Sequence, residues 1–217
     1  MSGELFAPDS NAPGMLVTID GPNGSGKTSL TAAVAAELRR GGAAIHSTHQ
    51  PSSGELGRMA RAEEAELRGR ALACLVAADR HQQVEGELAR HLAAGEIVLC
   101  DRYIESSLVL QSLDAVEIDF IVAINSGIRR PDLRIRLKAD AATIHRRLAS
   151  RQPDPGRRFE RSAAGERELS LYEDADRLLA DEYDLPAMVF DTTDTEAVEV
   201  GARAAALIRE RRAAKDG

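Results

Sequence analysis

A glycine-rich stretch near the N-terminal end places the strongest constraint on how this chain can fold. Residues 21–28 read Gly-Pro-Asn-Gly-Ser-Gly-Lys-Thr, and the spacing Gly-x-x-x-x-Gly-Lys-Thr is typical of a phosphate-binding loop (P-loop). Glycines allow the backbone to curl so that successive N–H groups point into one concavity. An apolar run at 15–19 precedes the stretch and a helical pattern at 29–40 follows it. This order of strand, loop and helix is the context that such a loop requires.

The loop predicts where a nucleotide would bind. Its backbone donors and the positive end of the following helix favour a polyphosphate. Lys27 is expected to reach the β- and γ-phosphates, and the Thr28 hydroxyl to help hold Mg²⁺. The alternative is a glycine-rich turn that matches by accident, but the flanking strand and helix would then be a coincidence as well. The residues predicted to bind ATP are Gly21, Pro22, Asn23, Gly24, Ser25, Gly26, Lys27, Thr28 and Ser29.

The composition is that of a globular protein and argues against nucleic acid as a partner. Hydrophobic residues make up 43% and charged residues 29% of the 217 positions, which is ordinary for a globular domain. The net charge of −7 lacks the basic footprint of a nucleic-acid-binding protein. Residues 1–14 contain no apolar run, and no segment reaches the length of a membrane span. We therefore expect a cytoplasmic protein without a membrane partner.

Strand-like and helical patterns alternate along the rest of the chain. This alternation predicts a parallel sheet with helices on both faces. The pattern at 131–137 alternates apolar and basic residues, which predicts a strand with one partly exposed face. We expect one α/β domain over residues 1–217, with a tail at 1–13 and the three-layer, five-stranded parallel sheet of P-loop NTPases. Its later strands are predicted at 43–48, 96–100, 131–137 and 187–190.

Two charged residues follow the third predicted strand. In an open α/β sheet, ligands gather at the carboxyl ends of the strands, and Asp101 and Arg102 come directly after residues 96–100. Asp101 is placed to orient Mg²⁺ or its water. The planar guanidinium of Arg102 suits an acceptor phosphate held by two hydrogen bonds. The alternative is an ordinary ion pair at the strand end, and the nearby phosphate loop favours the functional interpretation.

A long helix predicted at 69–94 carries an arginine on an otherwise apolar face. An unpaired buried arginine is costly, so Arg80 is expected either to pair with a carboxylate or to face a ligand cavity. The pattern alone leaves both alternatives open. Four residues share the face because they recur at spacings of four and three: Leu72, Val76, Arg80 and Gln83.

Arginines also cluster on both sides of a loop between residues 146 and 161. The centre of the loop, at 153–156, reads Pro-Asp-Pro-Gly and cannot be helical. In an acidic chain, this concentration favours a lid at about 151–161 whose guanidiniums neutralise charge on phosphates during transfer. The alternative is a solvated turn at the surface.

These motifs resemble those of the thymidylate kinases, a family of nucleoside monophosphate kinases. The run Asp-Arg-Tyr-x-x-Ser-Ser at 101–107 is quite specific to that family. The resemblance implies that Arg102 holds the acceptor monophosphate and that Arg80 contacts the pyrimidine base, with Ser107 and Gln111 beside the base and sugar. It also implies a homodimer and lid arginines that reach ATP. Besides 101–107, the matching segments are 21–28, the helix end at 77–80, 98–100, Gln111, 131–133 and 158–160.

Four departures from the family pattern all fall on the acceptor side. Asn23 replaces an Asp that contacts the acceptor sugar, and Val76 replaces a base-stacking Phe. Leu110 replaces a Tyr that commonly packs on the deoxyribose. Residues 48–51 read Thr-His-Gln-Pro instead of Thr-Arg-Glu-Pro. The residues expected to bind the acceptor are Asn23, Gln50, Val76, Arg80, Arg102, Ser107 and Gln111.

The expected activity is transfer of the ATP γ-phosphate, assisted by Mg²⁺, to dTMP or a related pyrimidine nucleotide. Such a transfer needs positioning and charge neutralisation more than a strong base. One alternative is a related enzyme for a modified nucleotide or another phosphorylated metabolite, and another is a nucleotide-binding regulatory protein without turnover. Thr28 and Asp101 are the expected metal ligands. The expected catalytic residues are Lys27, Asp101, Arg102, Arg151 and Arg158.

Overall fold

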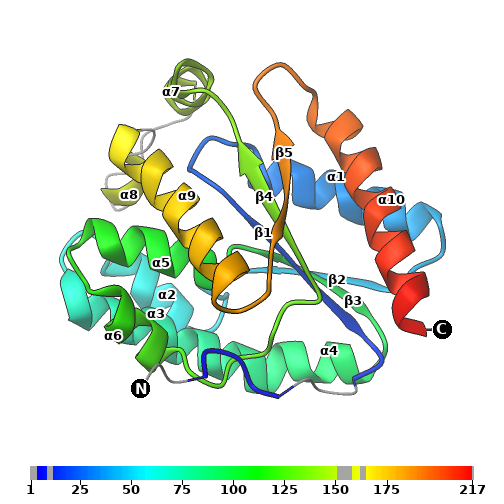
Figure 1. Ribbon diagram of the computed structural model, residues 1–217, viewed down its shortest axis with the longest axis horizontal. Helices are drawn as coiled ribbons and strands as arrows, with labels where there is room; N and C mark the ends of the chain where they lie inside the picture. Colours follow the sequence, from blue (N-terminus) through cyan, green and yellow to red (C-terminus); the bar gives the residue numbers. More distant parts are fainter. Residues whose placement is uncertain (1–3, 9–11, 151–157, 162–164, 217) are drawn as a thin grey trace.

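A computed structural model describes residues 4–8, 12–150, 158–161 and 165–216 and arranges them around one sheet (Figure 1). The strands are hydrogen-bonded in the order β2-β3-β1-β4-β5, and each neighbouring pair is parallel. The predicted five-stranded parallel sheet is therefore confirmed, with strand bounds that differ by one or two residues. The strands are β1 (Met15–Asp20), β2 (Ile45–His49), β3 (Ile97–Asp101), β4 (Leu133–Lys138) and β5 (Ala187–Asp191).

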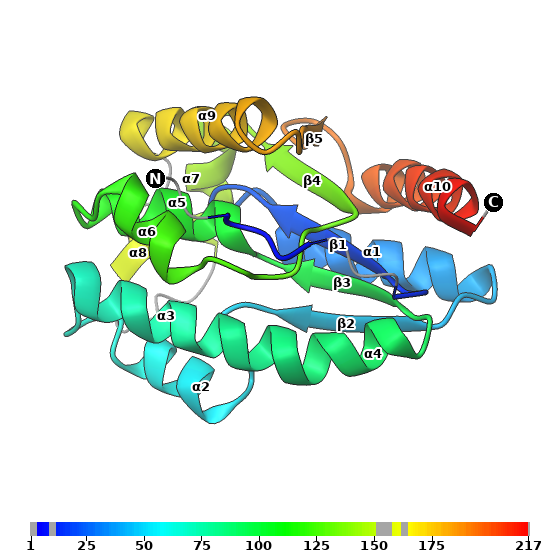
Figure 2. The ribbon, with the colours of Figure 1, turned by 60° about the horizontal axis from the view of Figure 1, so that its bottom comes forward.

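Helices cover both faces of this sheet. On one face α1 (Lys27–Arg40) lies beside α10 (Ala197–Asp216). The other face is covered by α3 (Gly69–Gln83), α5 (Ile104–Leu113) and α9 (Glu166–Asp181) (Figure 2). No helix within the described residues is long and apolar enough to cross a membrane. The remaining α-helices are α2 (Glu55–Ala62), α4 (Ala89–Ala93), α6 (Ile118–Ile124), α7 (Ala141–Ala149) and α8 (Arg158–Arg161).

The two faces of the sheet carry separate hydrophobic cores. Successive side chains of a strand point to opposite faces. Leu16 and Val98 accordingly lie in the core under α3, α5 and α9, whereas Val17 and Leu99 lie in the core under α1 and α10. A strand that is buried on both faces needs a continuous apolar run, which is the pattern that revealed the central strands in the sequence.

The strand register brings the ends of three strands to one edge of the sheet. Ile19 lies opposite Asp101 in the β1–β3 pair, and His49 lies opposite Asp101 in the β2–β3 pair. The phosphate loop, Gln50 and Arg102 therefore begin side by side, at the edge where ligands bind in such sheets.

The long helix predicted at 69–94 is continuous but changes its winding. α3 runs into a π-helical segment, Val84–Leu88, and then into α4 without a break. A π turn is rare, and it rotates the residues that follow it around the helix axis. Glu87 lies in this segment and contacts His46 of β2.

The basic face of β4 is partly exposed, as predicted: Lys138 is exposed and Arg136 is half-buried, but Arg134 is buried. Arg134 is 2% exposed, and its guanidinium donates to Glu105 of α5 at 2.6 Å and to Asp176 of α9 at 3.0 Å. Asp176 belongs to α9, a helix that the sequence analysis does not predict. Alternating apolar and basic residues are typical of a solvated face, but here the acidic partners come from distant segments.

Part of the predicted N-terminal tail belongs to the folded core. Leu5 and Phe6 are buried in the core that underlies α5 and α9. Phe6 forms an isolated parallel bridge with Ile128, and Ala7 N donates to Ile128 O at 2.9 Å. These contacts tie the segment that precedes β1 to the segment that precedes β4.

Replacing Arg134 by Met should destabilise the fold, and more so at high pH. Burial raises the pKa of Glu105 to about 7, although Arg134 beside it acts to lower that pKa. Without Arg134 the pKa rises further, and a carboxyl that binds protons more tightly in the folded state loses stability as pH rises. We expect the free energy of unfolding to fall by about 3 kcal/mol at pH 8 and by less at pH 6. The value at pH 8 is at the lower end of the range for a buried ion pair that has lost one partner.

Urea unfolding followed by circular dichroism at the two pH values measures this effect. Arg70→Met is the matched control, because it breaks an exposed ion pair with Glu117 that should contribute little. A loss for Arg134→Met that is the same at pH 6 and pH 8 would contradict the assigned role of Glu105.

Candidate active site

The phosphate loop connects β1 to α1 in the conformation that its glycines permit. Gly21, Gly24 and Gly26 all have positive φ angles, of 141°, 82° and 97°. A Cβ atom on Gly21 would lie 2.5 Å from the carbonyl oxygen of Leu137, so that position accepts only glycine. The loop predicted from the sequence is therefore in place at the carboxyl end of the central strand.

Lys27 begins α1, and its ammonium group is held inside the loop. Its Nζ donates to the carbonyl oxygens of Gly21 and Pro22, each at 2.8 Å. Burial, together with the charge of Arg102, lowers the pKa of Lys27 to about 7. A phosphate bound in the loop would favour the charged form of this lysine, because an adjacent opposite charge raises the pKa of an amine.

The two predicted metal ligands lie side by side. Thr28 Oγ1, at the start of α1, donates to Asp101 Oδ2, at the end of β3, at 2.8 Å. Magnesium prefers oxygen ligands at about 2.0–2.1 Å in an octahedron, so that adjacent ligand atoms lie about 2.9 Å apart. The hydroxyl and the carboxylate therefore fit two neighbouring positions around Mg²⁺.

A large groove passes over the phosphate loop. It has a volume of about 760 Å³, and Lys27, Thr28 and Asp101 all line it. Of the residues predicted to bind ATP, those that line it are Asn23, Gly24, Gly26, Lys27 and Thr28. Gly21, Pro22, Ser25 and Ser29 are not part of its wall. Ser25 is instead fully buried and accepts a hydrogen bond from Thr192 through its carbonyl oxygen.

Arg102 lies between the phosphate loop and α5. Its backbone has a positive φ of 73°, and its N–H donates to Ile19 O at 2.9 Å. The guanidinium donates to Ser106 Oγ at 2.9 Å and to the side-chain oxygen of Asn23. The fold thus brings Arg102 into contact with Asn23. Both are predicted acceptor residues, and they are distant in sequence.

Asp20 is a site residue that the sequence analysis did not identify. Its Oδ1 accepts hydrogen bonds from Tyr103 N at 3.3 Å and from Ser106 N and Oγ at 3.1 and 2.6 Å. Asp20 thereby fixes Ser106, which in turn contacts the guanidinium of Arg102. A charged residue at the end of a buried strand, directly before the loop, was the signal that could have revealed it.

A smaller pocket of about 60 Å³ lies next to the groove, among α2, α3 and α5. Apolar side chains of Leu72, Val76 and Leu110 form part of its wall. All predicted acceptor residues except Asn23 line it, namely Gln50, Val76, Arg80, Arg102, Ser107 and Gln111. Asn23 lines the neighbouring groove instead. The structure thus brings together six residues that the sequence distributes over two helices and two loops.

Arg80 has neutral hydrogen-bond acceptors in this pocket. It is 2% exposed, and burial lowers its pKa. Its Nε donates to Gln50 Oε1 and its Nη2 to Ser107 Oγ, both at 2.7 Å. It also donates to the side-chain oxygen of Asn125 and to Tyr103 O. Of the two alternatives for Arg80, the structure favours the cavity, since these acceptors are all neutral.

The predicted lid lies only partly within the described residues. Arg151 falls outside them. Arg158 does not line the groove or the pocket. Its guanidinium instead donates two hydrogen bonds to the carboxylate of Asp114, at 2.5 and 2.6 Å, and a third to Glu64 O.

Phe159, which follows Arg158, was not predicted but lines both cavities. Its backbone N–H donates to Glu64 Oε1 at 2.9 Å, and its carbonyl accepts from Asn23 Nδ2 at 3.3 Å. The ring is buried and lies under the guanidinium of Arg158, 4.2 Å from its central carbon. Aromatic side chains are therefore present in the pocket wall, but they come from Tyr103 and from Phe159 at the end of the predicted lid, not from position 76.

Comparison with known proteins agrees with this geometry. The family model described as thymidylate kinase matches residues 19–190. A probable thymidylate kinase of Pyrobaculum calidifontis is 38% identical over 143 residues, which cover 64% of this chain and 71% of that protein. A probable thymidylate kinase of Caldivirga maquilingensis is 35% identical over 141 residues, which cover 63% of this chain and 69% of that protein. A thymidylate kinase of Xanthomonas campestris pv. campestris is 33% identical over 144 residues, which cover 65% of this chain and 63% of that protein.

The matched region contains the phosphate loop from Gly21 onward, both predicted metal ligands and all the residues that line the smaller pocket. It also spans all the strands after β1 almost to the end of β5. Because the family model matches well over half of the chain, the chain belongs to the thymidylate kinase family and is a phosphotransferase.

Proposed function

We infer that this protein is a nucleoside monophosphate kinase that transfers the ATP γ-phosphate to dTMP or a closely related pyrimidine nucleotide. The observation that carries the proposal is the adjacency of the two cavities. A groove with Lys27, Thr28 and Asp101 adjoins a pocket with Arg80, and Arg102 lines both. A donor phosphate at the loop and an acceptor phosphate at Arg102 would therefore be neighbours. The related kinases support the same assignment.

The residues of the chain would act by positioning and by neutralising charge. Lys27 would leave its two carbonyl partners and bind the β- and γ-phosphates. Arg102 would hold the acceptor phosphate, oriented by Ser106 and Asn23. Mg²⁺ held at Thr28 and Asp101 would neutralise charge on the phosphates. An acceptor phosphate is already anionic, so we assign no general base.

The pocket supports a pyrimidine acceptor but differs from the family pattern. Arg80, Ser107 and Gln111 offer polar contacts to a base, whereas Val76 and Leu110 offer aliphatic surface where the family has rings. We rank dTMP first among acceptors. A pyrimidine with a bulkier or modified base is the second candidate, because valine leaves space in the wall. A homodimer and a cytoplasmic location form part of the same proposal and rest on the family resemblance.

Lys27→Ala should nearly abolish turnover and change the proton balance of nucleotide binding. The pKa of Lys27 is about 7, so a fraction of the lysine is neutral at pH 7 and takes up a proton when phosphates bind. Titration calorimetry of ATP with Mg²⁺ in buffers of different ionisation enthalpy measures that uptake. The uptake should be smaller in Lys27→Ala. Equal uptake and near-normal turnover in the variant would show that the loop is not the active site.

Substitutions of Arg102 and of Arg80 should affect acceptor binding in different ways. Arg102→Ala should weaken acceptor binding by roughly 1.5–3 kcal/mol for every base, the usual range for a charge-assisted hydrogen bond. Arg80→Lys retains the charge and should instead change the ranking among bases. The measurement is KM and kcat for dTMP, dUMP, UMP and dCMP with each variant. A uniform loss for both variants would contradict base contact by Arg80.

Val76→Phe tests the altered pocket. An aromatic face stacked on the base contributes on the order of 1 kcal/mol, so kcat/KM for dTMP should rise about fivefold. Acceptors with a bulkier base should become worse, because the pocket is only about 60 Å³ and already contains Phe159. Val76→Ile, which adds bulk without a ring, is the matched control. If the native protein uses only dTMP efficiently and Val76→Phe changes nothing, the altered-pocket proposal fails.

A further inference from the structure

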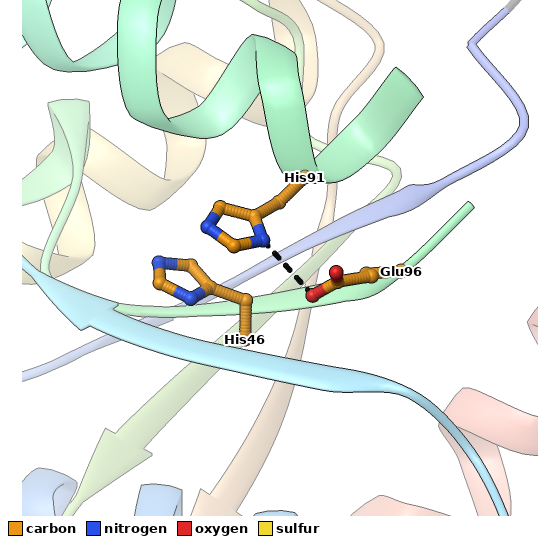
Figure 3. Close-up of side chains that lie close together, drawn as sticks. All are labelled: His46, His91 and Glu96. Carbon is orange, nitrogen blue, oxygen red and sulfur yellow. Dashed lines mark hydrogen bonds and ion pairs between the residues drawn. The ribbon is translucent and has the colours of Figure 1, made fainter. Parts of the chain in front are cut away.

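Two histidines and a glutamate converge at the end of the sheet opposite the phosphate loop (Figure 3). His46 lies near the start of β2, His91 lies on α4, and Glu96 immediately precedes β3. Each side chain is half-buried, and each offers a nitrogen or oxygen atom that lies within 4.8 Å of the other two. The phosphate loop and Arg102 lie at the carboxyl ends of the strands, so this cluster is separate from the candidate active site.

A fourth residue, Glu87, holds His46 from outside the cluster. Glu87 Oε1 lies 2.7 Å from His46 Nε2, which leaves Nδ1 as the nitrogen available for another ligand. Gln83 Nε2 donates to the other oxygen of Glu87 at 3.1 Å. A carboxylate that contacts the outer nitrogen of a histidine is the usual second-shell arrangement at metal sites, because it fixes the ring orientation and makes the free nitrogen a better ligand.

We propose that His46, His91 and Glu96 bind one divalent transition-metal ion of the Zn²⁺ class, with Glu87 as the carboxylate that orients His46. Two imidazoles and a carboxylate are donors that Zn²⁺ favours. Tetrahedral zinc ligands at about 2.0–2.1 Å lie about 3.3 Å apart, and His91 Nδ1 lies 3.0 Å from Glu96 Oε2. That pair therefore needs little movement to share one ion.

The two imidazole rings require a larger adjustment. They are stacked with centroids 3.6 Å apart and planes inclined by 7°, so their lone pairs lie in two nearly parallel planes and do not converge on one point. Rotation of one ring about its Cβ–Cγ bond corrects this, and such torsions have broad energy minima. Arg90 approaches His91 at Nε2, 3.5 Å away, and thus leaves Nδ1 beside Glu96.

The chemistry of the donor atoms distinguishes this site from the predicted Mg²⁺ site at the phosphate loop. Thr28 and Asp101 offer only oxygen, which suits Mg²⁺, whereas the histidine cluster offers nitrogen, which suits Zn²⁺. A metal ion at the cluster would join the edge strand β2, the end of the long helix and the segment before β3. Its effect would therefore be on stability, not on phosphoryl transfer.

The test uses the full chain after treatment with a chelator, with saturating Mg²⁺ present to occupy the oxygen site. Zn²⁺ is titrated by calorimetry, and the expected stoichiometry is one ion per chain. His91→Gln and Glu96→Gln should each weaken binding by at least about 100-fold, and Glu87→Gln by about 10-fold, as expected for a second-shell carboxylate. His145→Gln is the matched control, because His145 is exposed on α7 and should leave the affinity unchanged.

Two further measurements keep the outcome decisive. Co²⁺ in place of Zn²⁺ should give the visible absorption of a low-coordinate nitrogen and oxygen site, and His91→Gln should lose it. Zn²⁺ should raise the melting temperature of the native chain but not that of His91→Gln, whose folding is checked by circular dichroism. The proposal is overturned if Zn²⁺ does not bind saturably, if Mg²⁺ displaces it, or if binding persists in His91→Gln and Glu96→Gln. Absence of binding would indicate that the cluster is only two histidine–glutamate pairs.

Discussion

The carboxylate of Asp20 is the contact on which the rest of the site depends. Asp20 is the last residue of the central strand, and one of its carboxylate oxygens accepts three hydrogen bonds from the start of α5. Ser106, held in this way, positions the guanidinium of Arg102, and Arg102 contacts Asn23 in the phosphate loop. A strand end, a loop and a helix are thereby locked in one geometry. A buried hydrogen-bond network of this kind rigidifies a site, so the guanidinium of Arg102 is held in place before any ligand binds.

The sequence predicted the parts of this protein whose cause is local. The phosphate loop follows from three glycines that permit positive φ angles, and the central strands follow from apolar runs that are buried on both faces. Position alone identified Asp101 and Arg102, since they follow a strand. The missed features depend on contacts between distant segments. Arg134 is buried because Glu105 and Asp176 meet it, and Phe159 reaches the pocket because Glu64 and Asn23 hold its backbone. No periodicity encodes such contacts.

A row of hydrogen-bonded polar side chains leads away from the smaller pocket. Arg80 donates to Gln50, whose amide donates to Gln83, and Gln83 donates to Glu87, the residue that holds His46. Amide side chains can both donate and accept, so Gln50 and Gln83 connect Arg80 to Glu87 without a further buried charge. The row extends from the smaller pocket along α3 and into the π-helical segment, and it gives the buried Gln83 of α3 partners on both sides.

The position of Phe159 has a consequence for how the two substrates bind. Six residues line both cavities, and the groove and the pocket therefore share a wall: Gln50, Pro51, Glu64, Arg102, Leu110 and Phe159. A ligand that shifted this wall from one side would change the affinity on the other side. Thermodynamic linkage makes such coupling reciprocal, so whatever factor the nucleotide applies to acceptor affinity, the acceptor applies to nucleotide affinity. A ligand in either cavity would then change the affinity of the other cavity by the same factor, whichever ligand binds first.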